Sequence, residues 1–166
     1  MTRTDDIPDA YDERSVLLQM LHYTQDTAVA KVSGLSEELA HRAPLPESPL
    51  MTPVNLLNHL RWVERSWVNA DLFGGEDEAP WTDEDPDAEF RQGEDLTVTE
   101  AIELYEQEAA RTRATFAEVE LDMVRRGGRE QPVTARWILL HLIEETARHN
   151  GHLDILRELA DGSTGD

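Results

Sequence analysis

The sequence has no cysteine among its 166 residues. This absence excludes intrachain disulfides, thiolate ligands to a metal ion and a cysteine nucleophile. A metal ion must therefore be bound through histidine, aspartate, glutamate or carbonyl groups. Any thiol chemistry must likewise use the thiol of a bound small molecule.

Basic residues and long apolar runs are also scarce. The 15 lysines and arginines are outnumbered by 35 aspartates and glutamates, which gives a formal net charge of -20. Because this charge repels phosphate groups and anionic lipid heads, we expect neither nucleic acid nor a membrane as a partner. No apolar run could span a bilayer, and the N-terminus has no signal-peptide apolar region. We therefore expect a cytoplasmic protein, and the single lysine, Lys31, suggests an actinobacterial source.

Strand-like alternation is missing as well, whereas four stretches have apolar residues at helical spacing. We predict helices at roughly 11–32, 52–73, 97–124 and 134–160. Thr52 and Pro53 suit the N-cap and first position of the second helix, and Thr97 with Glu100 forms a capping-box pattern before the third. Together these features predict an all-α protein, a four-helix bundle that packs through apolar stripes.

The acidic segment 73–96 separates the second and third predicted helices. It contains Pro80 and Pro86, which favour a long loop. Such a loop could cover a functional site, but its dense charge favours a solvated connector. We interpret residues 1–166 as a single domain, with flexible ends at 1–9 and 162–166.

Three polar residues interrupt the apolar stripes of two predicted helices. Glu145 and His149 are four residues apart on one face of the fourth helix, and His59 lies within the inner stripe of the second. An unpaired buried polar group costs roughly 1–3 kcal/mol, whereas one divalent metal ion would satisfy all three groups. Two imidazoles and one carboxylate form a facial ligand set that leaves positions open for water or substrate.

Each of these residues also has a simpler interpretation. His59 alone suits a hydrogen-bonded core histidine, and Glu145 alone suits a carboxylate on the helix surface. His149 could bond to a backbone carbonyl. His141 and His152 flank the stripe, where they could support a ligand or lie on the surface.

Several neighbouring residues have an ordinary structural interpretation. We interpret Glu64 and Arg148 as exposed partners in ion pairs, which contribute little individually. We interpret the tryptophans of the helices as core or interface aromatics, a set made up of Trp62, Trp67 and Trp137.

Two segments carry a resemblance to a known family. "TPVNLLNHLRWVERSW" (52–67) and "RWILLHLIEETARHNGHLDILRELADGSTG" (136–165) resemble the DinB/YfiT-like superfamily of metalloenzymes, and more narrowly its actinobacterial branch, DUF664. "GLSEELAHR" (34–42) and the segment 82–114 also fit, so the resemblance covers nearly the whole chain. It implies a four-helix bundle of the up-down-down-up type with one divalent metal at its open end.

The resemblance also implies a ligand set. The family's second-helix ligand falls on His59, and its fourth-helix pair falls on Glu145 and His149. Much of the superfamily has His-x-x-x-His at this pair, whereas here the first member is Glu. The same departure occurs in the branch similar to mycothiol-dependent maleylpyruvate isomerase. The resemblance to that branch implies Zn²⁺ as the metal, with Ni²⁺, Mn²⁺ and Fe²⁺ as alternatives.

These considerations favour a metal-dependent thiol S-transferase. The thiol, mycothiol in an actinobacterial host, would lose its proton at the metal and attack an electrophilic small molecule. His152 is the candidate for support of a ligand or for proton transfer. The alternatives are a hydrolase that uses metal-activated water and a non-catalytic bundle that binds a small molecule or a partner. Exposed aromatic and apolar residues suggest a homodimer.

Overall fold

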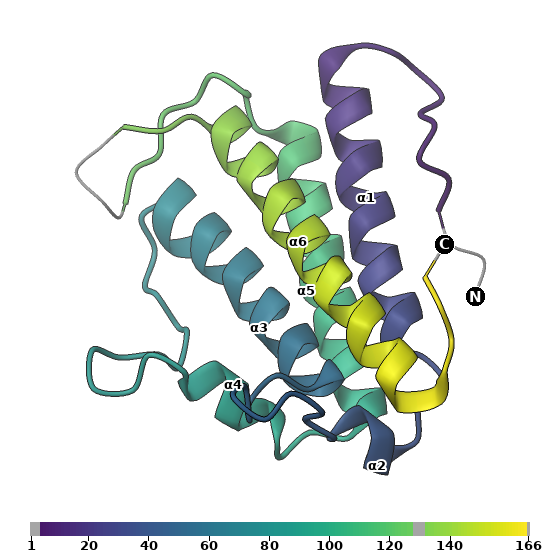
Figure 1. Ribbon diagram of the computed structural model, residues 1–166. Helices are drawn as coiled ribbons and strands as arrows, with labels where there is room; N and C mark the ends of the chain where they lie inside the picture. The colour runs from purple at the N-terminus through teal and green to yellow at the C-terminus, as the bar shows by residue number, and fades with distance from the viewer. Residues whose placement is uncertain (1–3, 128–131, 166) are drawn as a thin grey trace.

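Four long helices lie alongside one another in the computed structural model, which describes residues 4–127 and 132–165 (Figure 1). They are α1 (Glu13–Val32), α3 (Pro53–Arg65), α5 (Val98–Glu118) and α6 (Ala135–Asp161). The shorter elements are α2 (Glu37–Ala40), α4 (Ala88–Gly93) and the π-helical η1 (Ser66–Leu72), which continues α3. The described residues form no strand beyond an isolated bridge between Val124 and Thr134, so the all-α prediction is confirmed.

Polar caps begin α3 and α5 at the predicted residues. The side chain of Thr52 accepts a hydrogen bond from an amide in the first turn of α3, and Pro53 is the first residue of that helix. Thr97 and Glu100 form the predicted capping box of α5. The second helical stretch continues through η1 to Leu72, one residue short of the predicted end.

Two predicted helix ends are wrong. The first helix begins at Glu13, two residues later than predicted, because the side chain of Asp12 caps it. The third ends at Glu118, six residues earlier than predicted. The chain beyond Glu118 instead pairs with the start of α6, where the amide of Ala135 donates to the carbonyl of Met123. Backbone groups after α5 are therefore satisfied outside a helix.

Two apolar clusters fill the interior at different levels along the helices. The first includes Leu57, Tyr105, Leu153 and Leu156, and the second includes Leu21, Phe116, Leu139 and Leu142. Each long helix also buries polar residues, among them Thr24, Gln25, Glu64, Thr112, Glu145, Thr146 and His149. We call this set the polar layer. Burial of polar groups costs free energy unless they are paired, so the residues of this set are candidates for a functional role.

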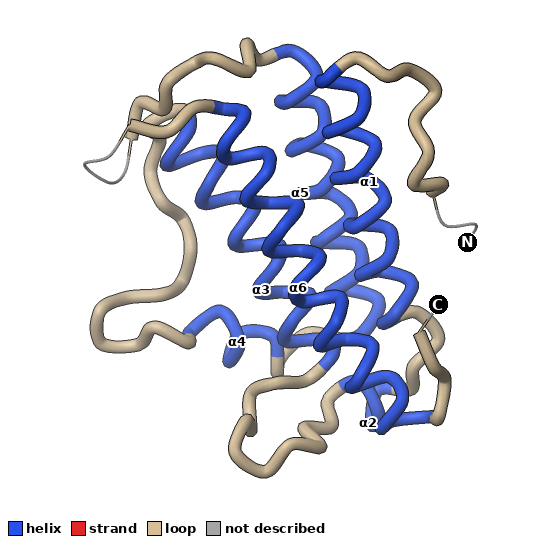
Figure 2. Tube along the Cα trace, turned by 45° about the horizontal axis from the view of Figure 1, so that its top comes forward, coloured by secondary structure: helices blue, strands red, loops and turns tan. Residues whose placement is uncertain are grey.

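The acidic segment 73–96 is not a loop throughout, because it contains α4 at its C-terminal end. Helix α4 packs against α3 (Figure 2). The amide of Asn58 donates to the backbone carbonyl of Glu89 at 2.6 Å, and a Cβ at Gly93 would lie 2.6 Å from the Asn55 amide oxygen. The interpretation of the segment as a solvated connector is therefore wrong for α4, because its backbone is held close to α3.

The predicted chain ends are only partly within the described residues. Residues 1–3 and 166, which belong to the ends predicted to be flexible, lie outside them. The backbone amide of Thr4 donates to the carboxylate of Asp26 at 3.1 Å, which ties the first described residue to α1. Every helix in the described ranges is too short or too polar to cross a lipid bilayer.

Candidate metal centre

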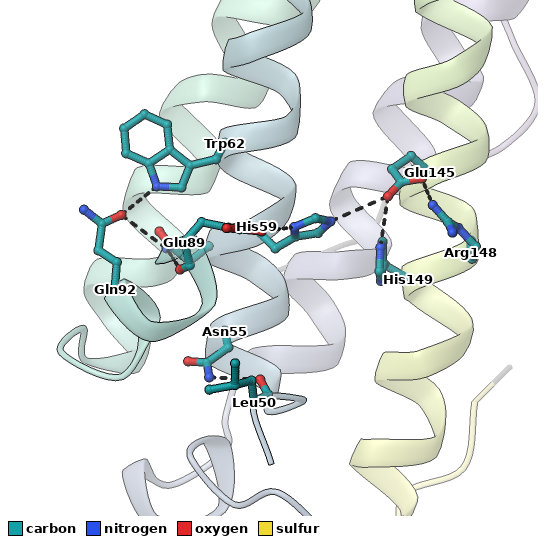
Figure 3. A network of polar contacts seen from close by, with 10 residues as sticks. Leu50, Asn55, His59, Trp62, Glu89, Gln92, Glu145, Arg148 and His149 are labelled. Atoms are coloured by element: carbon teal, nitrogen blue, oxygen red, sulfur yellow. Dashed lines mark hydrogen bonds and ion pairs between the residues drawn. The ribbon is translucent and has the colours of Figure 1, made fainter. Parts of the chain in front are cut away.

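His59 of α3 comes together with Glu145 and His149 of the polar layer, and the ligand atoms of the three residues all lie within 4.8 Å of one another (Figure 3). Oε1 of Glu145 is the common point. It lies 3.1 Å from Nε2 of His149 and 3.6 Å from Nε2 of His59. The two imidazole rings meet edge to face, with 4.9 Å between their centroids. A residue pair on α6 and one residue on α3 thus converge from facing helices.

The donor set fits a divalent first-row metal ion. Two imidazole nitrogens and one carboxylate oxygen are ligands that such ions accept, and three of them leave a position open. Ligands at 2.0–2.1 Å from a tetrahedral ion lie roughly 3.3 Å apart. The two separations from Glu145 to the imidazoles, 3.1 and 3.6 Å, bracket that value. The residues present therefore suit an ion with little rearrangement.

Glu89 of α4 contacts the far side of the His59 ring. Its Oε1 lies 3.1 Å from Nδ1 of His59, and Phe90 stacks on the ring with centroids 4.6 Å apart. Because a carboxylate accepts and does not donate, Nδ1 of His59 is the donor in this contact, and Nε2 is the nitrogen that a metal ion would bind. Glu89 thus contacts a candidate metal ligand, and the sequence interpretation missed it. It lies in a run of acidic residues, and nothing in its spacing distinguishes it from them.

His152 contacts the third member of the cluster. Its Nδ1 lies 3.2 Å from Nδ1 of His149. Burial, reinforced by the nearby His59 and Arg148, lowers the pKa of His149 to about 4. Burial, together with His149 and Arg148, also lowers the pKa of His152. Both imidazoles are therefore neutral near pH 7, the form in which a ring nitrogen can bind a metal ion.

Arg148 holds the second oxygen of Glu145. Its guanidinium forms an ion pair with Oε2 of Glu145 and lies 3.7 Å from the carboxylate of Glu144. The arginine side chain is half exposed, so its interpretation as an exposed ion-pair partner is confirmed. The ion pair leaves Oε1 of Glu145 directed at the two imidazoles.

Glu64 was expected on the surface, and this expectation is wrong. Its exposed fraction is 1%, and it lies in the polar layer near the buried Tyr105. The amide of Gln25 donates to Oε1 of Glu64 at 2.8 Å, and Arg113 donates to Oε1 of Gln25. Burial raises the pKa of Glu64 to about 7.

His141 lies away from the convergent residues. It stacks on Trp137, with centroids 5.1 Å apart, and meets Trp67 edge to face. Trp137 is 44% exposed, whereas Trp67 is buried. The three rings form an aromatic group. Trp137 and His141 precede Glu145 on α6, and Trp67 joins them from η1. Of the two flanking histidines, His152 is the one that contacts the cluster.

Comparison with known proteins identifies a family. A family model described as mycothiol-S-transferase matches residues 16–162. The matched range includes all three convergent residues as well as Glu89 and His152. No curated protein matches the chain.

Proposed function

The chain belongs to the mycothiol-S-transferase family, and from this premise we propose that it is a metal-dependent enzyme acting on a small-molecule thiol. The proposed reaction joins the sulfur of mycothiol, or of a similar thiol, to an electrophilic carbon. The chain has no cysteine, so the reacting sulfur belongs to the substrate. The observation that carries the proposal is the convergence of His59, Glu145 and His149 in a chain of this family.

Nε2 of His59, Oε1 of Glu145 and Nε2 of His149 would hold the ion. We propose Zn²⁺, with Ni²⁺, Mn²⁺ and Fe²⁺ as alternatives, because imidazole and carboxylate ligands suit all four. When bound, such an ion lowers the pKa of a thiol that coordinates it, so that the nucleophilic thiolate forms near neutral pH.

The surrounding residues would hold the ligands in position. Glu89 fixes the tautomer of His59, and Arg148 fixes the rotamer of Glu145. The contact between the Nδ1 atoms of His152 and His149 requires that one of them donates. With Nε2 of His149 used for the metal, Nδ1 of His149 donates and His152 accepts. This arrangement favours support of His149 as the role of His152 over direct proton transfer.

We also propose how the helices are ordered and how many domains the chain forms. The long helices would form an up-down-down-up bundle in one domain spanning residues 1–166. The colour gradient supports this order, because α1 and α6 run in one direction and α3 and α5 in the other (Figure 1). A homodimer remains a prediction, for which exposed Trp137 and Leu140 on α6 offer apolar surface.

The test is metal content, measured by mass spectrometry on untagged protein purified without added metal. Wild type should carry nearly one ion per chain, and His149→Ala should carry almost none. His41→Ala is the matched control, because His41 follows α2 and its ring contacts Glu37 of that helix, away from the convergent residues. Metal-free wild type that also binds no added Zn²⁺ or Ni²⁺ would refute the proposal. Turnover that proceeds without any thiol would instead favour a hydrolase.

A further inference from the structure

Two cavities border the convergent residues, and their walls differ in chemistry. The first, of about 500 Å³, is lined by His59, Ser66, Asp71, Asp77, Trp81 and Glu89 among others. We call it the acidic cavity. The second, of about 330 Å³, is lined by Pro49, Leu50, Met51, Leu56, Phe90 and His149 among others. We call it the apolar cavity. Both volumes lie in the range of small-molecule sites.

Helix α4 separates the two cavities next to the His59 ring. Glu89 lines the acidic cavity and binds Nδ1 of that ring, whereas the next residue, Phe90, lines the apolar cavity and stacks on its face. His59 borders the acidic cavity and His149 borders the apolar one. A reacting atom held between these two histidines would therefore be reached from both cavities.

Glu89 is one of the carboxylate residues that line the acidic cavity. It is only 3% exposed, and its Oε2, which is buried, has no hydrogen-bond partner within the described ranges. An unpaired acceptor is costly, so a small shift of this side chain toward a ligand hydroxyl would be favourable. Asp77 offers a further carboxylate, and the indole of Trp81 offers a flat apolar wall. Carboxylates accept hydrogen bonds from hydroxyls and repel anions.

The polar residues that line the apolar cavity besides its histidine are Ser48 and Asp87. Leu50, Met51, Leu56 and Phe90 supply hydrocarbon and aromatic surface, and the carboxylate of Asp87 is at the exposed margin. A hydroxyl-rich molecule would lose hydrogen bonds to water there without replacing them, whereas an apolar molecule would gain from burial. The lining therefore selects for an apolar ligand.

We propose that the two cavities are separate substrate subsites, the acidic one for the hydroxyl-rich body of an uncharged thiol and the apolar one for the electrophile. The assignment rests on the proposed function. Thiols that carry carboxylates or phosphates would be repelled by Asp77 and Glu89. In the transfer, the thiol sulfur bonds to the electrophilic carbon, the leaving group departs with the electron pair of the broken bond, and the thiol proton passes to solvent.

The test uses one substitution in each cavity and two probes. Mycothiol is the thiol, and monochlorobimane, which loses chloride on reaction, is the apolar electrophile. Leu50→Asn should raise the KM for monochlorobimane about fivefold or more and leave the KM for mycothiol unchanged. Trp81→Ala should raise the KM for mycothiol by a similar factor and leave the KM for monochlorobimane unchanged. Leu159→Asn and Trp137→Ala are the matched controls, since neither residue lines the acidic or the apolar cavity.

A binding measurement separates this inference from the proposed function. Unreactive dimethylbimane and mycothiol are titrated separately into the metal-loaded protein, with binding followed by NMR. Selective loss of dimethylbimane binding in Leu50→Asn and of mycothiol binding in Trp81→Ala would support the subsites even if no turnover occurs. Exposed Pro49→Asp and Asp77→Asn repeat the test with little risk to folding. Effects that are equal on both probes, or exchanged between the cavities, would overturn the assignment.

Discussion

The carboxylate of Glu89 lies 3.1 Å from Nδ1 of His59, and this contact decides which nitrogen of the imidazole carries the proton. The histidine belongs to α3 and the glutamate to α4, so the short helix within the acidic segment completes a site formed by the long helices. Hydrogen bonds of this kind orient metal-binding histidines and raise their basicity. The contact makes α4 part of the site.

Glu89→Gln should therefore weaken metal binding without removing it. The amide can still accept from Nδ1 of His59, but it lacks the negative charge, so we expect affinity to fall about 10- to 100-fold. Competition with a fluorescent chelator measures the change. Glu94→Gln, at an exposed carboxylate just after α4, should keep the wild-type affinity. Equal affinity in both variants would mean that Glu89 serves only to pack α4.

His152→Ala should have a smaller effect than removal of a ligand. The substitution takes away the acceptor that fixes the ring of His149, so we expect roughly a tenfold loss of metal affinity. His149→Ala should abolish binding. His141→Ala should leave the affinity unchanged, because that ring packs against Trp67 and Trp137. Unchanged affinity in His152→Ala with a lower kcat would assign His152 to proton transfer instead.

Glu64 should make the protein less stable as the pH rises from about 4.5 to about 7. Its pKa is raised from 4.5 to about 7 in the folded state by burial. In this interval the unfolded chain releases the proton and the folded protein retains it, so stability falls with pH. The fall from this one group amounts to about 3 kcal/mol and is complete above the folded pKa. Below pH 4.5 both states are protonated and the full stability is present.

The measurement is urea unfolding at several pH values, compared between wild type and Glu64→Gln. The variant keeps an acceptor for the Gln25 amide and cannot ionise, so its stability relative to wild type should increase from pH 4.5 to pH 8. Glu103→Gln, at an exposed carboxylate on α5, should show no such trend. Parallel pH profiles for wild type and Glu64→Gln would contradict a raised pKa at Glu64.

The sequence indicates some parts of the site and conceals others for physical reasons. Glu145 and His149 share a stripe with Leu142 and Leu153, so helical periodicity alone places their side chains in the interior. His59 is found in the same way. Glu89 leaves no such signal, because its helix is a short one in an acidic segment and its partner is 30 residues away.

Periodicity also fails to separate a buried carboxylate from an exposed one when basic residues lie nearby. Glu64 lies between Arg61 and Arg65, basic residues that could pair with it at the surface. In the structure Arg65 instead pairs with Glu78 and Glu108, and Glu64 faces the polar layer. Choosing between these arrangements requires the positions of α1 and α5, which a single helical stretch does not contain.

Removal of the metal should lower the melting temperature but leave the helices formed. Two apolar clusters, which include Leu57 and Leu139, hold the helices together without an ion. An ion present at 1,000 times its Kd adds about 4 kcal/mol of stability, and a chelator removes this amount. Far-UV circular dichroism with and without chelator tests the expectation, with His149→Ala as the variant that should not respond. Collapse of the helical signal on chelation would show that the ion is required for folding, the behaviour of a structural metal site, and would weaken the case for a catalytic one.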